Sequence, residues 1–222
     1  MKNKTIAIYG DSLSTYEGWV PEDALFYYPI YSQDVKNVEK TWWQLLIKKT
    51  ELKLHANISY SGSTVCGDQT SCGISDVRLS KLVIDGNTPD IIIILLGIND
   101  VCCGHDINEF KRTYKEMLSK MRKLCPNTDI FINNLHYETA SDGTGNAPES
   151  YIHIGLRDEY NKVFKEIAQE ENLMLIDLDS IITKETDSFG NKINVGDNIH
   201  FNAKGMETVC DAAYAVLKEF YK

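Results

Sequence analysis

An unbroken run of apolar residues at positions 91–96, Ile-Ile-Ile-Ile-Leu-Leu, is the feature that most constrains the fold. Strands that read as continuous apolar runs are buried on both faces, which is typical of parallel sheets covered by helices. Strand and helix signals alternate along the chain with mostly short connections, which predicts right-handed crossovers and an α/β fold. The predicted strands are residues 5–9, 52–58, 91–96, 129–133 and 174–177.

The helical signals fit between these strands. Two capping-box patterns, Thr41-Trp-Trp-Gln and Asp106-Ile-Asn-Glu, indicate the first turns of two helices. The predicted helices are residues 41–49, 76–83, 106–125, 156–171 and 202–221. The chain has 222 residues, of which 43% are hydrophobic, and it contains neither internal repeats nor linkers. We therefore expect one domain over residues 1–222.

The net negative charge of the chain indicates which classes of binding partner are unfavourable. The net charge of −9 and the pI of about 5.1 disfavour nucleic acid and anionic membranes as partners. No apolar run approaches the roughly 18 residues that a membrane span needs. The first residues, Met-Lys-Asn-Lys, precede the first strand without the apolar stretch of a signal peptide, so we expect a cytoplasmic protein. The sequence leaves the oligomeric state open.

The six cysteines are too few for a disulfide scaffold in a chain of this length, and their spacing is not that of a structural zinc site. Packed, reduced thiols are the simplest interpretation. Four of them fall on two loops that could face each other, which leaves a bridge or a metal site open; these four are Cys66, Cys72, Cys102 and Cys103.

The first predicted strand runs directly into Gly10-Asp11-Ser12. Ligands of open α/β sheets bind just beyond the carboxyl ends of the strands, so Ser12 lies where chemistry is expected. A serine hydroxyl is a weak nucleophile unless a base lies within hydrogen-bond reach. The chain must therefore supply that base from elsewhere.

Among the five histidines, His200 is the best candidate for the base. It follows Asp197 by three residues in a turn that leads into the last helix, so the carboxylate could orient one ring nitrogen while the other faces Ser12. The simpler interpretation is a capping Asp197 and a surface histidine. The other four histidines have no acid at a comparable spacing, although Asp106 neighbours His105.

Acyl transfer also needs donors for a developing oxyanion. Asn99 follows the apolar strand in Gly97-Ile-Asn99-Asp, and its neutral amide could donate a hydrogen bond without acting as a base. Gly62 follows the second strand and could present its backbone N–H. Taken singly, both are weak signals, because such segments are more often simple turns.

The order of these motifs resembles that of the SGNH hydrolases, also called the GDSL esterase and lipase family. The matching positions extend over nearly the whole chain: Gly10-Asp-Ser-Leu, Asn57 with Ser61-Gly62 and Thr64, Gly97-Ile-Asn-Asp, and Asp197, His200, Asn202 and Gly205. The resemblance implies a three-layer α/β/α, flavodoxin-like fold with a five-stranded parallel sheet of order 2-1-3-4-5.

The resemblance also implies roles. Ser12 would be the nucleophile, His200 the base and Asp197 its orienting acid. The oxyanion hole would consist of the backbone N–H groups of Ser12 and Gly62 and the side-chain amide of Asn99. The family pattern implies ester hydrolysis through an acyl-serine intermediate, with neither a metal nor an organic cofactor.

The substrate is less constrained than the mechanism, beyond being a small-molecule ester. An aromatic segment within residues 17–40 and the loop at 135–150 could border the site, and the candidate substrate contacts are Trp19, Tyr27, Tyr28 and His136. Aromatic rings with polar tips suit sugars and short acyl chains, although the same rings could simply pack a loop onto the body. We expect a small acyl group, most plausibly acetyl on a carbohydrate. The alternatives are a thioesterase or lysophospholipase-type hydrolase and a catalytically silent carbohydrate-binding protein.

Overall fold

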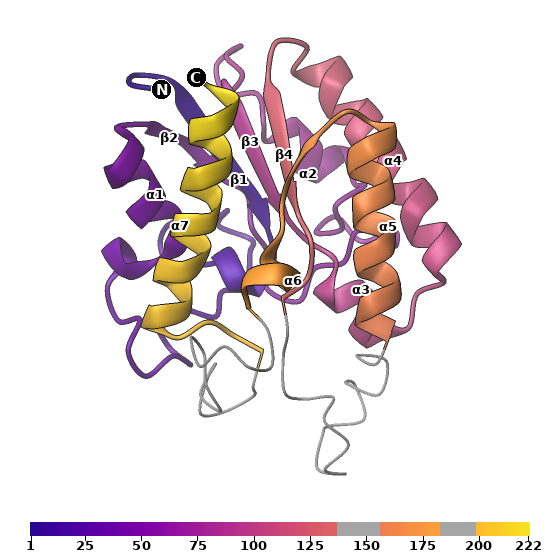
Figure 1. Ribbon diagram of the computed structural model, residues 1–222, viewed down its shortest axis with the longest axis horizontal. Helices are drawn as coiled ribbons and strands as arrows, with labels where there is room; N and C mark the ends of the chain where they lie inside the picture. Colours follow the sequence, from indigo (N-terminus) through magenta and orange to yellow (C-terminus); the bar gives the residue numbers. More distant parts are fainter. Residues whose placement is uncertain (137–155, 183–198) are drawn as a thin grey trace.

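The computed structural model describes residues 1–136, 156–182 and 199–222. Its centre is a five-stranded parallel sheet of order β2-β1-β3-β4-β5, as predicted. The strands, coloured from indigo to orange in Figure 1, are β1 (Thr5–Gly10), β2 (Lys53–Asn57), β3 (Ile91–Leu95), β4 (Asp129–Asn133) and β5 (Met174–Ile176). All five residues of β3 are buried, which confirms that the apolar run is a central strand.

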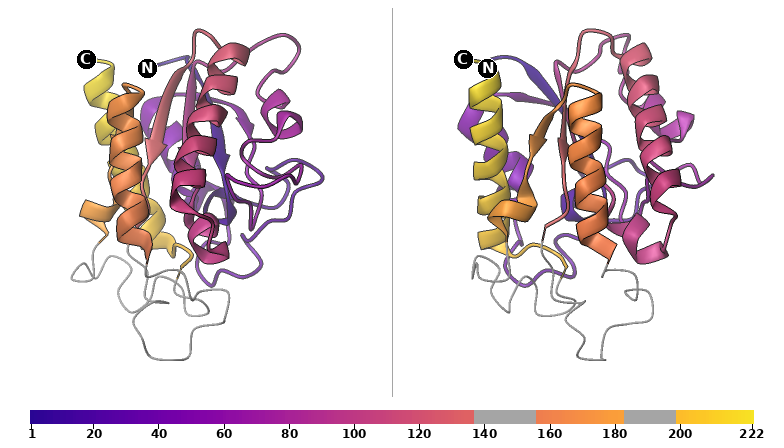
Figure 2. Two further views of the ribbon diagram at one scale, coloured as in Figure 1. Left: turned by 90° about the vertical axis from the view of Figure 1, so that its right-hand side faces the viewer. Right: turned by 45° about the vertical axis from the view of Figure 1, so that its right-hand side comes forward.

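The direction of each crossover decides which face its helix covers. The chain moves from β1 to β2 in one direction and from β2 through β3 and β4 to β5 in the other, so right-handed crossovers place α1 on the face opposite α2, α4 and α5. The last helix, α7, returns to pack along α1 (Figures 1 and 2). These helices are α1 (Trp42–Thr50), α2 (Asp76–Ser80), α4 (Ile107–Leu124), α5 (Arg157–Glu170) and α7 (Ala203–Phe220).

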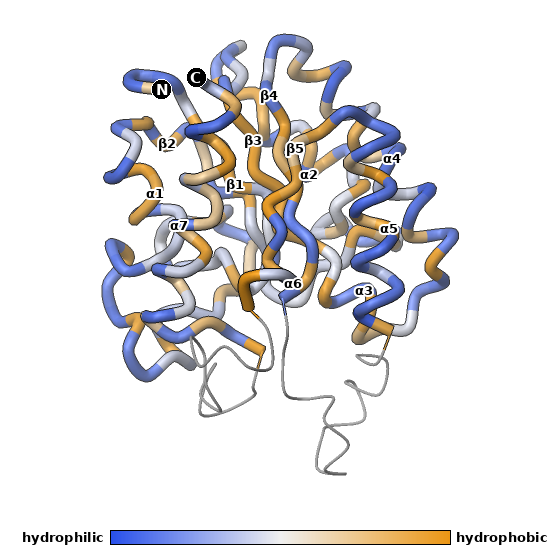
Figure 3. Tube along the Cα trace, in the orientation of Figure 1, coloured by the Kyte–Doolittle hydropathy of each residue, from blue (hydrophilic) through white to orange (hydrophobic). Residues whose placement is uncertain are grey.

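The hydropathy pattern follows these layers. The strands are mainly hydrophobic, whereas α4 and α5 alternate between hydrophobic and hydrophilic positions along their length (Figure 3). On α4 the buried residues recur at helical spacing, which is the pattern expected of one apolar stripe on a surface helix; they are Phe110, Tyr114, Met117, Leu118 and Met121. Within the described residues, no helix combines the length and the apolar character that a membrane crossing requires.

The two predicted capping boxes differ in outcome. Asp106 caps α4 with its side chain, which accepts hydrogen bonds from the backbone N–H groups of Asn108 and Glu109. Thr41 does precede α1, but its hydroxyl donates backward to the Val38 carbonyl and makes no capping bond. The prediction of a capping box at Thr41 is therefore wrong, because a local turn takes up the hydroxyl.

Three short helices were not anticipated from the sequence. They are the 3₁₀ turn η1 (Ser12–Ser14) and the helices α3 (Ile98–Cys103) and α6 (Leu178–Ile181), which follow β1, β3 and β5. A further 3₁₀ turn, η2 (Val38–Lys40), precedes α1. The Gly97-Ile-Asn-Asp segment therefore opens a helix, and Asn99 lies in its first turn.

Gly97 makes that sharp change from strand to helix possible. Its φ of +130° is a conformation that residues with a Cβ rarely adopt. A Cβ at this position would lie 2.9 Å from Cζ of Phe164 and 3.3 Å from Cζ of Phe110. Backbone conformation and packing therefore both require glycine at the entrance to α3.

We expect Gly97→Ala to lower the free energy of unfolding by about 3 kcal/mol, since it adds backbone strain to an overpacked core. Gly86→Ala is the matched control, because its φ of +76° is also positive but its Cβ would meet no atom within 4 Å. That variant should lose only about 1 kcal/mol. Urea denaturation of both variants measures the difference, and equal losses would show that the aromatic contact is unimportant.

Candidate active site

The two ends of the chain meet at Ser12 and His200. Ser12 opens η1 directly after β1, and His200 precedes α7, whose N-cap Asn202 accepts a hydrogen bond from the Gly205 N–H. Nε2 of His200 lies 2.7 Å from Oγ of Ser12, and both side chains are largely buried. This is the geometry of a serine hydroxyl paired with a candidate base.

The ring of His200 is held by two tyrosines. The Tyr27 ring stacks on it with centroids 3.5 Å apart and an interplanar angle of 5°. Tyr28 meets the imidazole edge-on at 6.4 Å, and its hydroxyl donates to the backbone carbonyl of Phe201. Tyr27 and Tyr28, in the aromatic segment after Ser12, therefore fix the orientation of the His200 ring.

This placement revises the expected substrate contacts. Tyr28 is fully buried, so its ring packs inside the protein instead of facing a ligand. His136 is also buried, and one of its ring nitrogens, Nε2, lies 3.0 Å from the carbonyl oxygen of Ile199. Burial lowers the pKa of His136 to about 4, so the ring is neutral at physiological pH. We therefore assign His136 and Tyr28 to the support of the segment that carries His200.

Asn99 and Gly62 lie on neighbouring segments. The Asn99 side-chain amide donates to the backbone carbonyl of Ser63 at 2.9 Å, which ties the first turn of α3 to the loop after β2. Gly62 is exposed and has a φ of +76°, in the left-handed region. Asn99 and Gly62 are thus linked through Ser63, which follows Gly62 in the chain and accepts the hydrogen bond from the Asn99 amide.

Asp197 and nearly all of the loop at 135–150 lie outside the described residues. The expected role of Asp197 as the orienting acid therefore remains a prediction.

Asp11 is buried beside the nucleophile. One of its oxygens, Oδ1, accepts a hydrogen bond from the Leu13 N–H at 3.0 Å and so shapes the η1 turn. Burial raises the pKa of Asp11 to about 7, although the Leu13 N–H and the positive charge of Arg78 both favour the ionised form. This carboxyl group therefore titrates close to neutral pH.

A second buried carboxylate, Asp100, organises the loop after β2. Its two oxygens accept hydrogen bonds from the backbone N–H groups of Val65 and Cys66, and Oδ1 also lies 3.0 Å from Nδ1 of His105. His105 thus has an acid partner that its sequence spacing did not indicate, because the turn after α3 brings Asp100 to it. The hydrogen bond with Asp100 raises the pKa of His105.

None of the six cysteines is part of a disulfide, so the four loop cysteines are not bridged to one another. Among the described residues, one group could supply three metal ligands, namely Cys66, Asp100 and His105, whose ligand atoms lie within 4.8 Å of one another. Burial and the Asp100 charge raise the pKa of the Cys66 thiol to about 12, so the thiol stays protonated. With the oxygens of Asp100 already committed to backbone N–H groups, we interpret this group as a structural support of the loop.

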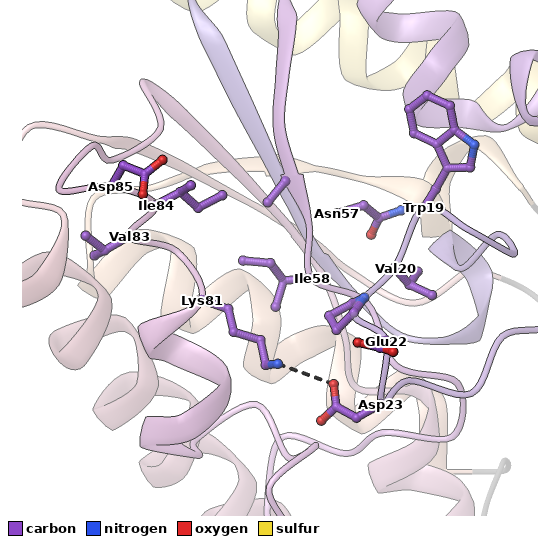
Figure 4. Close-up of a pocket in the computed structure, with 12 residues that line it drawn as sticks. Trp19, Val20, Glu22, Asp23, Asn57, Ile58, Lys81, Val83, Ile84 and Asp85 are labelled. Atoms are coloured by element: carbon purple, nitrogen blue, oxygen red, sulfur yellow. Dashed lines mark hydrogen bonds and ion pairs between the residues drawn. The ribbon is translucent and has the colours of Figure 1, made fainter.

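A wide groove lies at the carboxyl end of the edge strand β2, where Ala56, Asn57 and Ile58 line it (Figure 4). Its volume is about 860 Å³, and its lining is both apolar and charged. The ring of Trp19 is 42% exposed and lies 5.8 Å from that of Trp43, while Lys81 and Asp23 form an ion pair of 3.3 Å within the lining. Of the expected substrate contacts, Trp19 is thus the one that borders an open groove.

Arg78 was not among the residues expected at the site from the sequence. Its side chain is fully buried and donates hydrogen bonds to the carbonyl of Gly10, next to the nucleophile turn, and to the hydroxyl of Ser63. A single arginine on a short helix carries no sequence signal of burial, because arginines are normally exposed. Only its tertiary contacts reveal the connection to the site.

The titration of Asp11 predicts a pH-dependent stability. Its pKa in the folded chain, about 7, lies above the ordinary value of 3.8, so the folded chain binds the proton more tightly. The stability that protonated Asp11 contributes to the folded chain is fully present below pH 4 and is lost as the pH rises through 7. Asp11→Asn keeps an acceptor for the Leu13 N–H but does not titrate.

Wild type should therefore lose stability when the pH rises from 5 to 8, whereas Asp11→Asn should not. Over this change we expect the free energy of unfolding of the variant to rise by about 2 kcal/mol relative to that of wild type. Urea denaturation of both proteins at the two pH values measures this gain. A stability difference that is the same at pH 5 and pH 8 would contradict the burial effect.

Comparisons with known proteins identify the family of this chain. A model of the GDSL-like lipase/acylhydrolase family matches residues 4–216. A multidomain esterase from Ruminococcus flavefaciens is 26% identical over 180 residues, which cover 71% of this chain and 22% of that protein. The matched region thus spans about a fifth of the length of this relative.

Solved structures show the same fold. A protein from Bacteroides ovatus described as a GDSL-like lipase superposes with a TM-score of 0.72 at 24% identity, covering 99% of this chain and 100% of that one. A carbohydrate acetylesterase family member from Sinorhizobium meliloti gives a TM-score of 0.71 at 17% identity, covering 97% and 98%. The family match over nearly the whole chain confirms the resemblance in the sequence motifs: this chain belongs to the GDSL-like lipase/acylhydrolase family.

Proposed function

We propose that this protein is a serine esterase that hydrolyses its substrate through an acyl-serine intermediate. The contact of 2.7 Å between Ser12 Oγ and His200 Nε2 carries the proposal. His200 accepts the hydroxyl proton as Ser12 attacks the ester carbonyl, and it then protonates the departing alcohol. In the second half of the reaction, His200 activates the water that releases the acid.

The charge that develops on the carbonyl oxygen needs preorganised donors. We assign these to the backbone N–H groups of Ser12 and Gly62 and to the amide of Asn99. The Asn99 amide has two N–H donors, so one can hold the Ser63 carbonyl while the other serves the oxyanion. Asp197 is the proposed partner of the second ring nitrogen of His200.

A fluorophosphonate probe tests the nucleophile. We expect the wild-type protein to be labelled covalently, and Ser12→Ala and His200→Ala to lose labelling, because the hydroxyl is activated only by the paired imidazole. Ser80→Ala is the matched control, since Ser80 is an exposed serine whose hydroxyl donates to the Val77 carbonyl. Intact-mass spectrometry reads out the adduct.

A wild-type protein that stays unlabelled would contradict the esterase and would favour a silent binding protein. Labelling that persists in Ser12→Ala would place the reactive group elsewhere.

For the substrate, we propose an acetyl ester on a carbohydrate. The groove at the carboxyl end of β2 supports this assignment, because it combines the exposed ring of Trp19 with the carboxylates of Glu22, Asp23 and Asp85 and the amine of Lys81. Sugars present apolar faces to aromatic rings and hydroxyl groups to charged side chains. The protein from Sinorhizobium meliloti that is described as a carbohydrate acetylesterase family member shares this fold, which favours the same substrate class.

We expect acetate release from acetylated xylan, and turnover of p-nitrophenyl esters that falls as the acyl chain lengthens from two to eight carbons. Trp19→Ala should raise KM for acetylated xylan several-fold and leave p-nitrophenyl acetate unchanged, because neither Ser12 nor His200 lines the groove and we expect only a long substrate to contact both. Leu25→Ala is a control, since Leu25 is exposed on the same segment but does not line the groove.

A preference for acyl chains of eight carbons or more would overturn the acetyl assignment. Faster release of a thiol or a lysophospholipid leaving group would instead favour a thioesterase or a lysophospholipase.

A further inference from the structure

Arg78 is a fully buried cation whose hydrogen bonds in the described part of the chain all go to neutral oxygens. Its guanidinium lies 4.2 Å from the ring centroid of Tyr9 and 5.1 Å from that of Tyr60. Burying a guanidinium is costly unless its donors are used and its charge is compensated. Two aromatic faces supply part of this compensation through cation–π attraction.

The donors of Arg78 reach three backbone carbonyls and one side-chain hydroxyl. Nη2 donates to the carbonyl of Gly10 at 2.5 Å and to that of Ile58 at 2.9 Å, the latter also contacted by Nε. Nη1 donates to the hydroxyl of Ser63 at 3.0 Å and to the carbonyl of Ser71 at 2.7 Å. One planar group thus joins the carboxyl ends of β1 and β2 to the loop that follows β2.

These contacts lead directly to the proposed oxyanion donors. Gly10 precedes the turn that presents Ser12, and Ser63 follows Gly62 in the chain. Ser63 also accepts, at its backbone carbonyl, the hydrogen bond from the amide of Asn99. Two hydrogen bonds through Ser63 therefore connect the guanidinium to the Asn99 side chain.

The planar fork explains why arginine suits this position. Its five N–H groups have fixed directions, so the carbonyls and the hydroxyl that they contact are held in fixed positions relative to one another. A lysine would supply a flexible point charge without this geometry. An apolar side chain would fill the space, but it would leave the carbonyl of Gly10 with only the backbone N–H of Tyr60 as a donor and would remove the donor to the hydroxyl of Ser63.

We propose that Arg78 is a positioning residue that sets the oxyanion hole, holding Gly62 and Asn99 through Ser63 and the nucleophile turn through Gly10. This inference rests on the proposed esterase function. Arg78 does not touch the substrate; it acts through the groups that do.

The sharpest test is Ser63→Ala, which removes the hydroxyl that Arg78 contacts and keeps the backbone carbonyl that Asn99 contacts. With p-nitrophenyl acetate, we expect kcat to fall about 10-fold, because one hydrogen bond to a charged group is lost, and KM to change less than twofold. Arg78→Lys should lower kcat further, about 100-fold. Ser80→Ala, on the same helix, should retain wild-type kinetics.

A double-mutant cycle separates positioning from general destabilisation. Asn99→Ala alone should lower kcat 100-fold or more, which is the usual effect of losing an oxyanion donor. If Ser63 acts through Asn99, the Ser63→Ala/Asn99→Ala double variant should be little slower than Asn99→Ala. Effects that multiply would show that the Ser63 hydroxyl acts independently of Asn99 and would overturn the proposal.

A structural readout keeps this test separate from the esterase proposal. In ¹H–¹⁵N spectra of the full chain, Ser63→Ala should shift the side-chain amide of Asn99 and the backbone amide of Gly62, whereas Ser80→Ala should leave both unchanged. Shifted amides in a protein that turns over no ester would contradict the esterase and retain the positioning role. Unshifted amides would overturn the positioning role whether or not the protein is an esterase. Ser63→Ala also keeps the inference testable if Arg78→Lys fails to fold.

Discussion

All five strands of the sheet run in the same direction, and the rest of the molecule depends on this constraint. Parallel pairing sends every strand's carboxyl end to one edge, so the segments that follow β1, β2 and β3 come together without being close in sequence. Ser12, Gly62 and Asn99 lie on these three segments. His200 reaches the same edge because the chain returns there before α7 packs along α1.

That edge concentrates buried polar groups that are satisfied mainly by backbone. Asp11 shapes the turn at the nucleophile, and Asp100 holds two N–H groups of the loop after β2. Arg78 binds the carbonyl at the end of β1 and that of the residue after β2. Each desolvated charge costs free energy unless its hydrogen bonds are made, so these groups act as cross-links between the segments that the parallel sheet brings to this edge. The position of the Asn99 amide is a consequence of these cross-links.

Much of the fold follows from local pattern. The apolar run at β3 predicted a central strand covered on both faces, and regular alternation predicted the layers, because a strand buried on both sides needs helices above and below it. The short helices η1, α3 and α6 did not follow. Too few residues form them for periodicity to show, and at α3 the entry depends on a positive φ at Gly97 and on its contact with Phe164, which no local pattern reveals.

For the candidate site, the sequence by itself determined which residues were available: a serine after a strand, a histidine before the last helix, and a glycine and an asparagine after two further strands. Motif order is sufficient for this, because strand ends in a parallel sheet converge. Only the tertiary structure decided what each neighbouring side chain does. It turned Tyr27 onto His200, buried Tyr28 and His136, paired His105 with Asp100, and placed Arg78 under the nucleophile turn. Burial and partner choice arise from contacts between segments far apart in the chain, so no spacing within a motif encodes them.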